Sequence, residues 1–151
     1  MARVRPTLLA FLICGEVALN ELQEVTLVRV FDTFNIRMEV STEDEEAALK
    51  EIHTNGIRVG CTVFTKWGMG EGTFTEELRW ARPDGVESVT KSQYEMGLPG
   101  GFCFHQTRRI VTARANQSGD YSFRLYLDGE LVAKHPLKVN IEVKVAPSSA
   151  R

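Results

Sequence analysis

Residues 119–145 read GDYSFRLYLDGELVAKHPLKVNIEVKV, and this stretch decides the fold. Apolar and polar residues alternate on both sides of Asp128-Gly129, a dipeptide that favours a tight turn between antiparallel strands. The apolar parity holds Tyr121, Phe123 and Leu125 before the turn, and Leu131, Ala133, Leu137, Val139, Ile141, Val143 and Val145 after it. The stretch therefore predicts a β-hairpin with one face buried in the core.

The length of the turn sets which residues of the hairpin face each other. A two-residue loop would place Phe123 opposite Lys134, which is polar. A three-residue loop, with Gly129 in the left-handed conformation, would place Phe123 opposite Ala133. We predict the three-residue loop.

Length and composition are those of one globular domain, residues 1–151. Hydrophobic residues make up 43% of the chain and charged residues 25%. This is enough apolar material for a core that needs neither a disulfide nor a metal ion. The net charge of −2 lacks the basic excess that nucleic-acid binding requires, so we expect no nucleic-acid partner. No apolar run is long enough to span a membrane, and the run from Thr7 to Cys14 is interpreted as a buried strand rather than a removed signal. Three cysteines without a framework spacing favour reduced thiols and a cytoplasmic location.

The first two predicted strands, 7–18 and 25–36, are apolar on both faces. Such strands need a cover on each side, either from a helix or from another subunit. The candidate interface residues are Leu9, Phe11 and Ile13 in the first strand, with Ile141, Val143 and Val145 near the C-terminus.

One short helix is predicted near 42–53, within the stretch 41–55. Thr42 is placed to cap its start and Glu45 to complete a capping box, while Asn55-Gly56 supplies the stop. The acidic run 43–46 suits the N-terminal end of a helix dipole and is interpreted as a solvated helix start, not a cation site.

The middle of the chain predicts further strands at 57–67, 73–82, 86–90 and 102–115. A glycine-rich connection at 68–72 leads from strand to strand, which phosphate-binding loops do not do. Residues 91–101 are the least regular stretch, and we predict a surface loop there whose candidate binding residues are Tyr94, Met96 and Leu98. In total the pattern predicts an all-β fold, an antiparallel immunoglobulin-like β-sandwich of about eight strands with one short helix.

Two resemblances accompany this pattern. Gly119-Asp120-Tyr121-Ser122-Phe123 resembles the Gly-x-Tyr-x-apolar step of immunoglobulin-like sandwiches, which implies that the Tyr121 hydroxyl bonds back to the main chain. The stretches RPTLL (5–9) to FD (31–32), GDYSF (119–123) and LDGELV (127–132) together resemble short bacterial all-β proteins of unknown function. That family implies no activity, cofactor or catalytic residue.

Chemistry-bearing residues are few. Cys103 and His105 lie two apart, so they would share one face of a strand, and Cys61 or His53 could complete a zinc set. Cys103 with His105 could also serve a small hydrolase. Neither pattern is diagnostic, and we expect no catalytic residue, no metal and no cofactor. The sequence favours a non-catalytic cytosolic binding or assembly module with a protein partner, and the alternatives are a secreted or surface adhesion module and the hydrolase.

The final apolar parity, from Leu131 to Val145, is long for one strand of a compact sandwich. Pro136 could mark a change of sheet, or the end of the chain could form an arm. We predict the arm: residues 139–145, within a possible C-terminal arm or tail at 140–151, pair with a neighbouring subunit and make a homo-oligomer.

Overall fold

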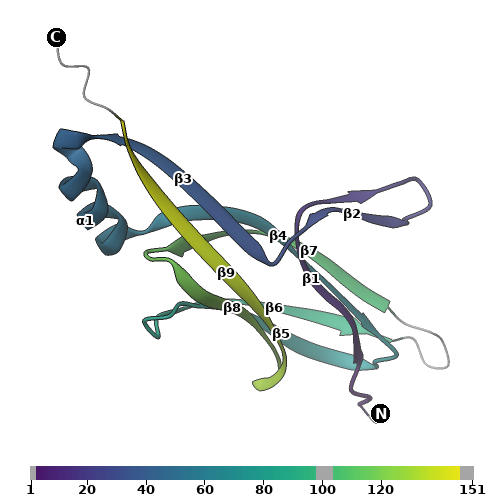
Figure 1. Ribbon diagram of the computed structural model, residues 1–151. Coiled ribbons are helices and arrows are strands. Elements are labelled where there is room, and N and C mark those ends of the chain that lie inside the picture. Colours follow the sequence, from purple (N-terminus) through teal and green to yellow (C-terminus); the bar gives the residue numbers. More distant parts are fainter. Residues whose placement is uncertain (1–2, 98–103, 147–151) are drawn as a thin grey trace.

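The computed structural model describes residues 3–97 and 104–146 (Figure 1). These residues form nine strands, one short 3₁₀ turn at Thr42–Asp44 and one α-helix, α1, at Glu45–Asn55. The strands are β1 (Thr7–Leu19), β2 (Val25–Val30), β3 (Thr33–Ser41), β4 (Ile57–Gly68), β5 (Gly72–Ala81), β6 (Glu87–Met96), β7 (Phe104–Ala115), β8 (Gly119–Leu127) and β9 (Glu130–Ala146). The prediction of an all-β fold with one short helix is confirmed. No helix in the described ranges is long and apolar enough to cross a membrane.

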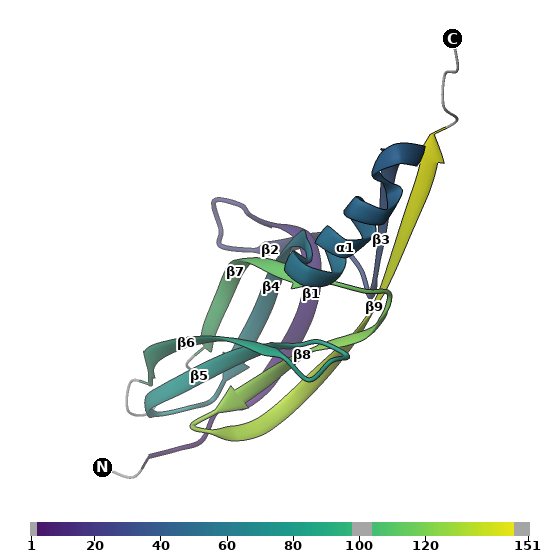
Figure 2. The same ribbon diagram turned by 90° about the vertical axis from the view of Figure 1, so that its left-hand side faces the viewer.

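The strands form two sheets. The four-stranded sheet has the order β2-β1-β4-β7, and the five-stranded sheet has the order β3-β9-β8-β5-β6. Figure 2 shows them as two layers. All neighbouring strands are antiparallel except β3 and β9, which run parallel, so the expectation of a purely antiparallel fold is wrong at this pair.

The main core fills the space between the sheets, and a second, smaller cluster contains Cys14, Val17 and Phe64. The residues with at most 1% exposure in this core are Ile13, Val63 and Trp67 from the four-stranded sheet, with Ala115, and Phe123, Leu125 and Val139 from the five-stranded sheet. Trp67 and Trp80 both lie in the core. For Trp80 the sequence already indicates this, because Trp80 shares the parity of Phe74 and Leu78.

The β8–β9 hairpin differs from the prediction in its register. Asp128 and Gly129 both have positive φ, 50° and 83°, and Leu127 faces Glu130, so the loop has two residues rather than three. A bulge then shifts the pairing, because Tyr126 faces Leu131 whereas Leu125 faces Ala133. Phe123 consequently lies opposite His135.

The predicted second strand, 25–36, is two strands in two different sheets. Arg29 has a φ of 58°, a conformation that L-residues rarely adopt inside a strand, and β2 ends at Val30. The Phe31 amide bonds to the Ile13 carbonyl at 3.0 Å and the chain then enters β3. The break lets residues 33–41 leave β1 and join β9.

Helix α1 ends as predicted but starts differently. The Gly56 amide, at φ 76°, donates to the Ile52 carbonyl at 2.8 Å and closes the last turn. Thr42 is not the cap residue: it lies in the 3₁₀ turn, and neither helix start has a side-chain cap bond. Ser41 instead bonds to Asp44 at 2.6 Å, so the capping box with Glu45 is wrong.

The predicted C-terminal arm is part of the protein's own sheet. Residues 139–146 pair along their length with β3, from Phe34 opposite Val139 to Ser41 opposite Ala146. Ile141, Val143 and Val145 are half-buried on the apolar face of this ribbon, so they are not free to pair with a neighbouring subunit in the way predicted.

The other candidate interface residues divide between core and surface. Ile13 is 0% exposed and belongs to the core, which removes it from any interface. Leu9 is 46% exposed, and Phe11 is half-buried with its ring 6.0 Å from that of His135.

The predicted binding loop at 91–101 is largely strand. β6 runs to Met96, and both Tyr94 and Met96 are buried on its inner face. The error has a simple cause: Ser92, Tyr94 and Met96 alternate with Lys91, Gln93 and Glu95, a weak period of two that the following glycines obscured. Leu98 lies outside the described residues.

The Tyr121 hydroxyl donates to the Gln117 carbonyl at 2.7 Å and accepts from the Gln117 amide at 3.3 Å. The bond back to the main chain that the GDYSF step implied is therefore present. Tyr121 also stacks on Trp80, with ring centroids 4.9 Å apart. We call this arrangement, in which Tyr121 bonds back to Gln117 and packs in the core, the Tyr121 corner.

Two buried thiols give a first testable prediction. Burial raises the pKa of Cys61 to about 12, and burial also raises the pKa of Cys14. Because thiol reagents attack the thiolate, both groups should stay neutral and unreactive at about pH 8 in the folded protein. In a Cys103→Ser variant we expect no labelling by iodoacetamide until a denaturant is added, as read by mass spectrometry. Labelling of the native variant at the rate of the unfolded chain would contradict this packing.

Candidate functional site

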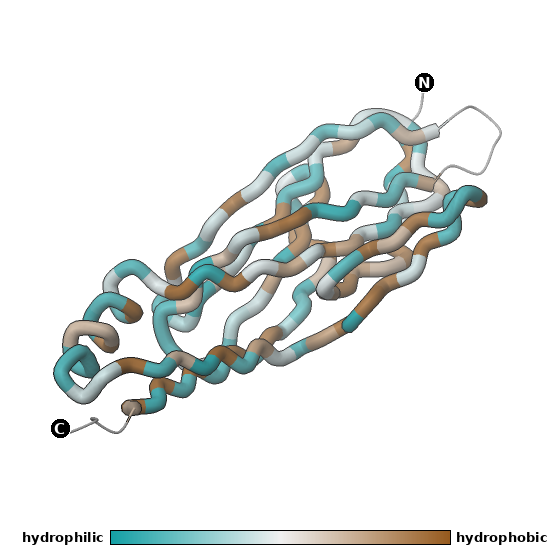
Figure 3. Tube along the Cα trace, turned by 90° about the horizontal axis from the view of Figure 1, so that it is seen from above, coloured by the Kyte–Doolittle hydropathy of each residue, from teal (hydrophilic) through white to brown (hydrophobic). Residues whose placement is uncertain are grey.

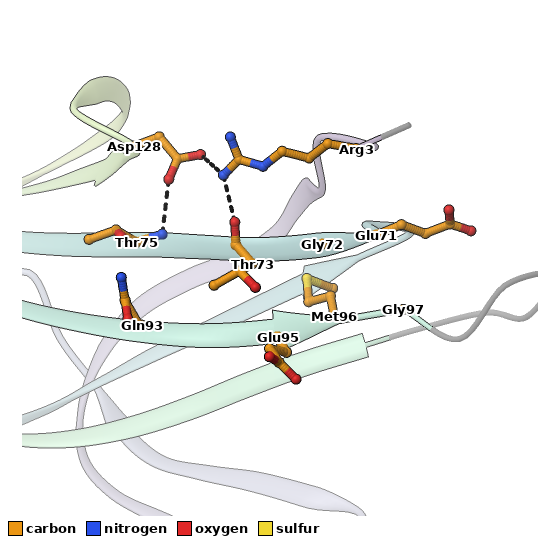
Figure 4. Close-up of a pocket in the computed structure, with 10 residues that line it drawn as sticks. All are labelled: Arg3, Glu71, Gly72, Thr73, Thr75, Gln93, Glu95, Met96, Gly97 and Asp128. Carbon is orange, nitrogen blue, oxygen red and sulfur yellow. Dashed lines mark hydrogen bonds and ion pairs between the residues drawn. The ribbon is translucent and has the colours of Figure 1, made fainter. Parts of the chain in front are cut away.

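A notch lies on the outer face of the five-stranded sheet, where β8 ends and the neighbouring strand β5 continues. The last β5–β8 pair is Glu76 with Leu127, whereas β5 and β6 continue together to Gly72 and Met96. The notch encloses about 690 Å³ and is lined by Arg3, Glu71, Gly72, Thr73, Thr75, Gln93, Glu95, Met96, Gly97 and Asp128 (Figure 4). This volume lies within the range of small-ligand sites.

The turn residue Asp128 closes one wall of the notch. Its amide donates to the Thr75 carbonyl at 2.8 Å, and its carboxylate accepts from the Thr75 amide at 3.0 Å. Asp128 thus replaces the missing β8 residue beside β5. Asp128 reaches this position because it has a positive φ in the two-residue turn. A three-residue loop would have placed the Asp128 side chain elsewhere.

Arg3 lies beside Asp128 on the same side of β5 (Figure 4). Its guanidinium donates to the Thr73 carbonyl at 2.7 Å, forms an ion pair with Asp128, and lies 4.4 Å from the centre of the Phe74 ring. Val4 holds the segment in place through two backbone bonds of 2.9 Å with Glu71. The N-terminal segment therefore contributes a side chain to a site built mainly from β5 and β6.

The lining is acidic. It contains the three carboxylates of Glu71, Glu95 and Asp128 and the single cation of Arg3, a formal charge of −2. Arg3 is paired with Asp128. Among the described residues no cation pairs with Glu71 or Glu95.

Two other carboxylates on the same outer face, Glu77 and Glu87, form ion pairs. Glu77 lies 2.6 Å from Arg79 and 3.4 Å from Lys91, and Glu87 lies 3.2 Å from Arg124. Burial by itself raises the pKa of Glu77, but bonds from Arg79 and Lys91 outweigh burial and hold that pKa below its usual value. Glu71 and Glu95 differ from these two residues, because neither has an ion pair among the described residues.

Behind the notch, the inner faces of β5 and β6 meet β4 and β7 around a buried ion pair. Glu76 is 0% exposed, and its carboxylate accepts from Arg109 at 2.6 Å and from the Trp67 indole at 2.5 Å. Arg109 also bonds to Ser92. This cluster joins the edge strand of one sheet to the edge strand of the other.

His105 and Tyr94 form a stacked pair in the same region. Their ring centroids lie 3.9 Å apart and their planes differ by 2°. Burial lowers the pKa of His105 and raises the pKa of Tyr94. The Tyr94 hydroxyl is buried, with no hydrogen-bond partner among the described residues.

The residues considered for zinc or hydrolysis are not brought together. His105 lies opposite Trp67 and Cys61 lies opposite Val111, six residues away along β4, which is about 20 Å. His53 lies on α1, and Cys103 is outside the described residues. No group of three metal-ligating side chains occurs in the ranges 3–97 and 104–146.

Sequence reasoning missed the residues that build the notch. Arg3 and Asp128 are 125 positions apart, and no local pattern relates them. The burial of Glu76 could have been predicted, because Glu76 shares the parity of the apolar residues Phe74, Leu78 and Trp80. A carboxylate buried on that face needs a cation or hydrogen-bond donor as partner.

Comparison with known proteins gives little. No protein-family model matches the chain, and no curated protein sequence matches it. One solved structure that is similar over 86% of this chain is the Pseudomonas fluorescens alkylpurine DNA glycosylase AlkC bound to DNA containing an abasic site analog. The chain covers 30% of that protein, at 10% identity and a TM-score of 0.37. A likeness of this size shows neither a shared fold nor a shared function.

Proposed function

We propose that this protein is a non-catalytic binding module whose notch takes a cationic group from a partner protein. The observation that carries the proposal is the pair of carboxylates, Glu71 and Glu95, that line a 690 Å³ notch and have no ion pair with any described cation. A guanidinium or ammonium group bound beside either carboxylate would gain charge-assisted hydrogen bonds. Thr73, Thr75 and Gln93 add polar groups for orientation.

The ligand class follows from the shape as well as the charge. The notch lies in an open sheet face, so an arginine or lysine side chain of another protein can enter it while the rest of the partner stays outside. The described lining residues include no cysteine and no histidine, so the cysteine–histidine hydrolase considered from the sequence has no counterpart in this site. A binding role therefore fits this site better than the hydrolase.

The compartment and the finer fold type belong to the same proposal. Cytosolic location is supported by the two buried, unpaired thiols of Cys14 and Cys61. The immunoglobulin-like sandwich is supported by the Tyr121 corner, whereas the parallel pairing of β3 with β9 departs from that type.

Calorimetric titration with N-acetyl-arginine amide tests the function, with the neutral isostere N-acetyl-citrulline amide as control ligand. For one side chain we expect a dissociation constant of about 1 mM. Glu71→Gln/Glu95→Gln should weaken binding about 30-fold, because it removes two charge-assisted bonds that contribute roughly 1 kcal/mol each. The charge-matched control, Glu43→Gln/Glu46→Gln on the helix side, should bind as the native protein does. Equal binding of both ligands, or no effect of the notch variant, would overturn the proposal.

The Arg3→Ala variant gives a second prediction for the same titration. Removing the cation of Arg3 leaves Asp128 as a third unpaired carboxylate, so binding of N-acetyl-arginine amide should tighten by about 3- to 10-fold. Arg5→Ala, which breaks the neighbouring exposed pair with Glu130 at 2.7 Å, is the matched control. Weaker binding by Arg3→Ala would show that Arg3 contacts the ligand and that the notch is not a cation site.

A further inference from the structure

The outer edge of β3 is open. β3 is the terminal strand of the five-stranded sheet and pairs with β9 on one side. In the part of the chain that the structure describes, no strand pairs with its other side. A row of backbone N–H and C=O groups is thus available along residues 33–41, which is how sheets recruit further strands.

The β3–β9 ribbon has one apolar and one charged face. In the parallel register Ile36, Met38 and Val40 lie beside Ile141, Val143 and Val145, and all six are half-buried. The opposite face carries Arg37 and Glu39 beside Glu142 and Lys144. Figure 3 shows this alternation of hydrophobic and hydrophilic residues along both strands, at the end of the molecule that carries α1.

We propose that a second copy of this chain adds its own β3 to this edge, antiparallel and centred on Met38. The two five-stranded sheets then become one continuous sheet across a two-fold axis. This surface is distinct from the notch, which lies toward the opposite edge of the same sheet, and the inference does not rest on the proposed cation binding.

Charge selects this register. With Met38 opposite Met38 of the second copy, Arg37 faces Glu39 twice, and Ile36 faces Val40 twice on the apolar side. A centre on Arg37 or on Glu39 would instead place two like charges opposite each other, which is destabilising. A shift of one residue would set the apolar face of one strand against the charged face of the other.

The pairing also extends a charge ladder that the single chain already begins. Arg37 lies 3.3 Å from Glu142, and Glu39 is in register with Lys144. Across the dimer each row therefore reads Glu142, Arg37, Glu39 of the second copy and Lys144 of the second copy, with alternating signs. Arg37 is 82% exposed in the single chain, so it is accessible to the second copy.

The interface is small, and this sets the expected strength. One strand pair with its flanking side chains falls below the roughly 1,600 Å² of a standard stable interface. We therefore expect a reversible dimer with a micromolar dissociation constant.

Sedimentation equilibrium of the full chain, from about 1 µM to about 1 mM, measures this dissociation constant. Arg37→Glu and Glu39→Arg should each weaken self-association about 10-fold or more, because each places two like-charged pairs across the axis. An equimolar mixture of the two variants should recover dimerisation, since both cross-strand pairs are then Glu with Arg. Arg58→Glu, an exposed reversal on β4, should leave the native dissociation constant unchanged. A native protein that stays monomeric over this range, or a mixture that associates no better than either variant alone, would overturn the proposal.

Cross-linking provides a second readout that does not depend on charge. In the Cys103→Ser background, Met38→Cys should form a disulfide-linked dimer on mild oxidation, because the two-fold axis places the two positions together. Asn35→Cys lies on the other face and away from the axis, so it should form none. A linked dimer from Asn35→Cys and not from Met38→Cys would overturn the register.

Discussion

Replacing Arg109 with methionine is expected to lower the free energy of unfolding by about 3–5 kcal/mol, because it leaves the carboxylate of Glu76 buried without its cation. The side chain of Glu76 is 1% exposed and that of Arg109 is 14% exposed, so little water would reach the carboxylate to compensate. The loss is measured by guanidinium denaturation followed through tryptophan fluorescence, to which Trp67 should contribute.

A second substitution separates the lost charge from the lost packing. Adding Glu76→Gln to Arg109→Met removes the unpaired charge and retains an acceptor for the Trp67 indole. The double variant should therefore be more stable than Arg109→Met. If Glu76→Gln instead lowers stability further in that background, the carboxylate was not the source of the loss.

Replacing Phe123 with alanine should also lower the free energy of unfolding by about 3–5 kcal/mol, through the cavity it creates. Phe123 is 0% exposed, its ring lies 4.8 Å from that of Trp80, and β8 pairs with a neighbour on each side. The matched control is Arg124→Ala, the next residue of the same strand. Arg124 points outward and loses one ion pair of 3.2 Å with Glu87, so its cost should stay below about 1 kcal/mol. Similar losses in both variants would show that the β8 register is wrong.

Local signals in the sequence predicted the elements well. The alternation around Asp128-Gly129 located β8 and β9, Gly56 marked the end of α1, and the GDYSF step indicated the Tyr121 corner. Each signal depends on residues a few positions apart, whose geometry the backbone fixes.

Register and strand pairing could not be predicted in the same way. The bulge in β9 moves Phe123 from its expected partner to His135, and the left-handed Arg29 separates β2 from β3. Neither feature involves Gly or Pro, the residues that usually signal such a break. The parallel pairing of β3 with β9 joins segments about a hundred positions apart, which no local pattern predicts. The segment predicted to be an arm therefore pairs within its own chain and not with a neighbouring subunit.

The notch was beyond local reasoning for the same reason. Its walls come from the N-terminal segment, the β4–β5 connection, β5, β6 and the β8–β9 turn. The sequence placed the binding site near residues 94–98, and β6 does contribute to the notch, through Met96 and through the outward Gln93 and Glu95. Tyr94 is buried and does not line the notch.

The two proposals combine into one arrangement. β3 and β6 are opposite edges of the five-stranded sheet, so a dimer formed through β3 would carry a notch toward each outer end. Two weak cation sites on one rigid sheet could engage two basic side chains of the same partner, which raises the effective affinity without a new contact.

A heteronuclear NMR titration of the native protein with N-acetyl-arginine amide tests most directly whether the notch recognises a cation. We expect the largest shift changes on the backbone amides of Thr73, Thr75, Gln93 and Glu95, and no shift changes there with N-acetyl-citrulline amide. Shift changes centred elsewhere on the protein, or the same changes with both ligands, would contradict cation recognition by the notch.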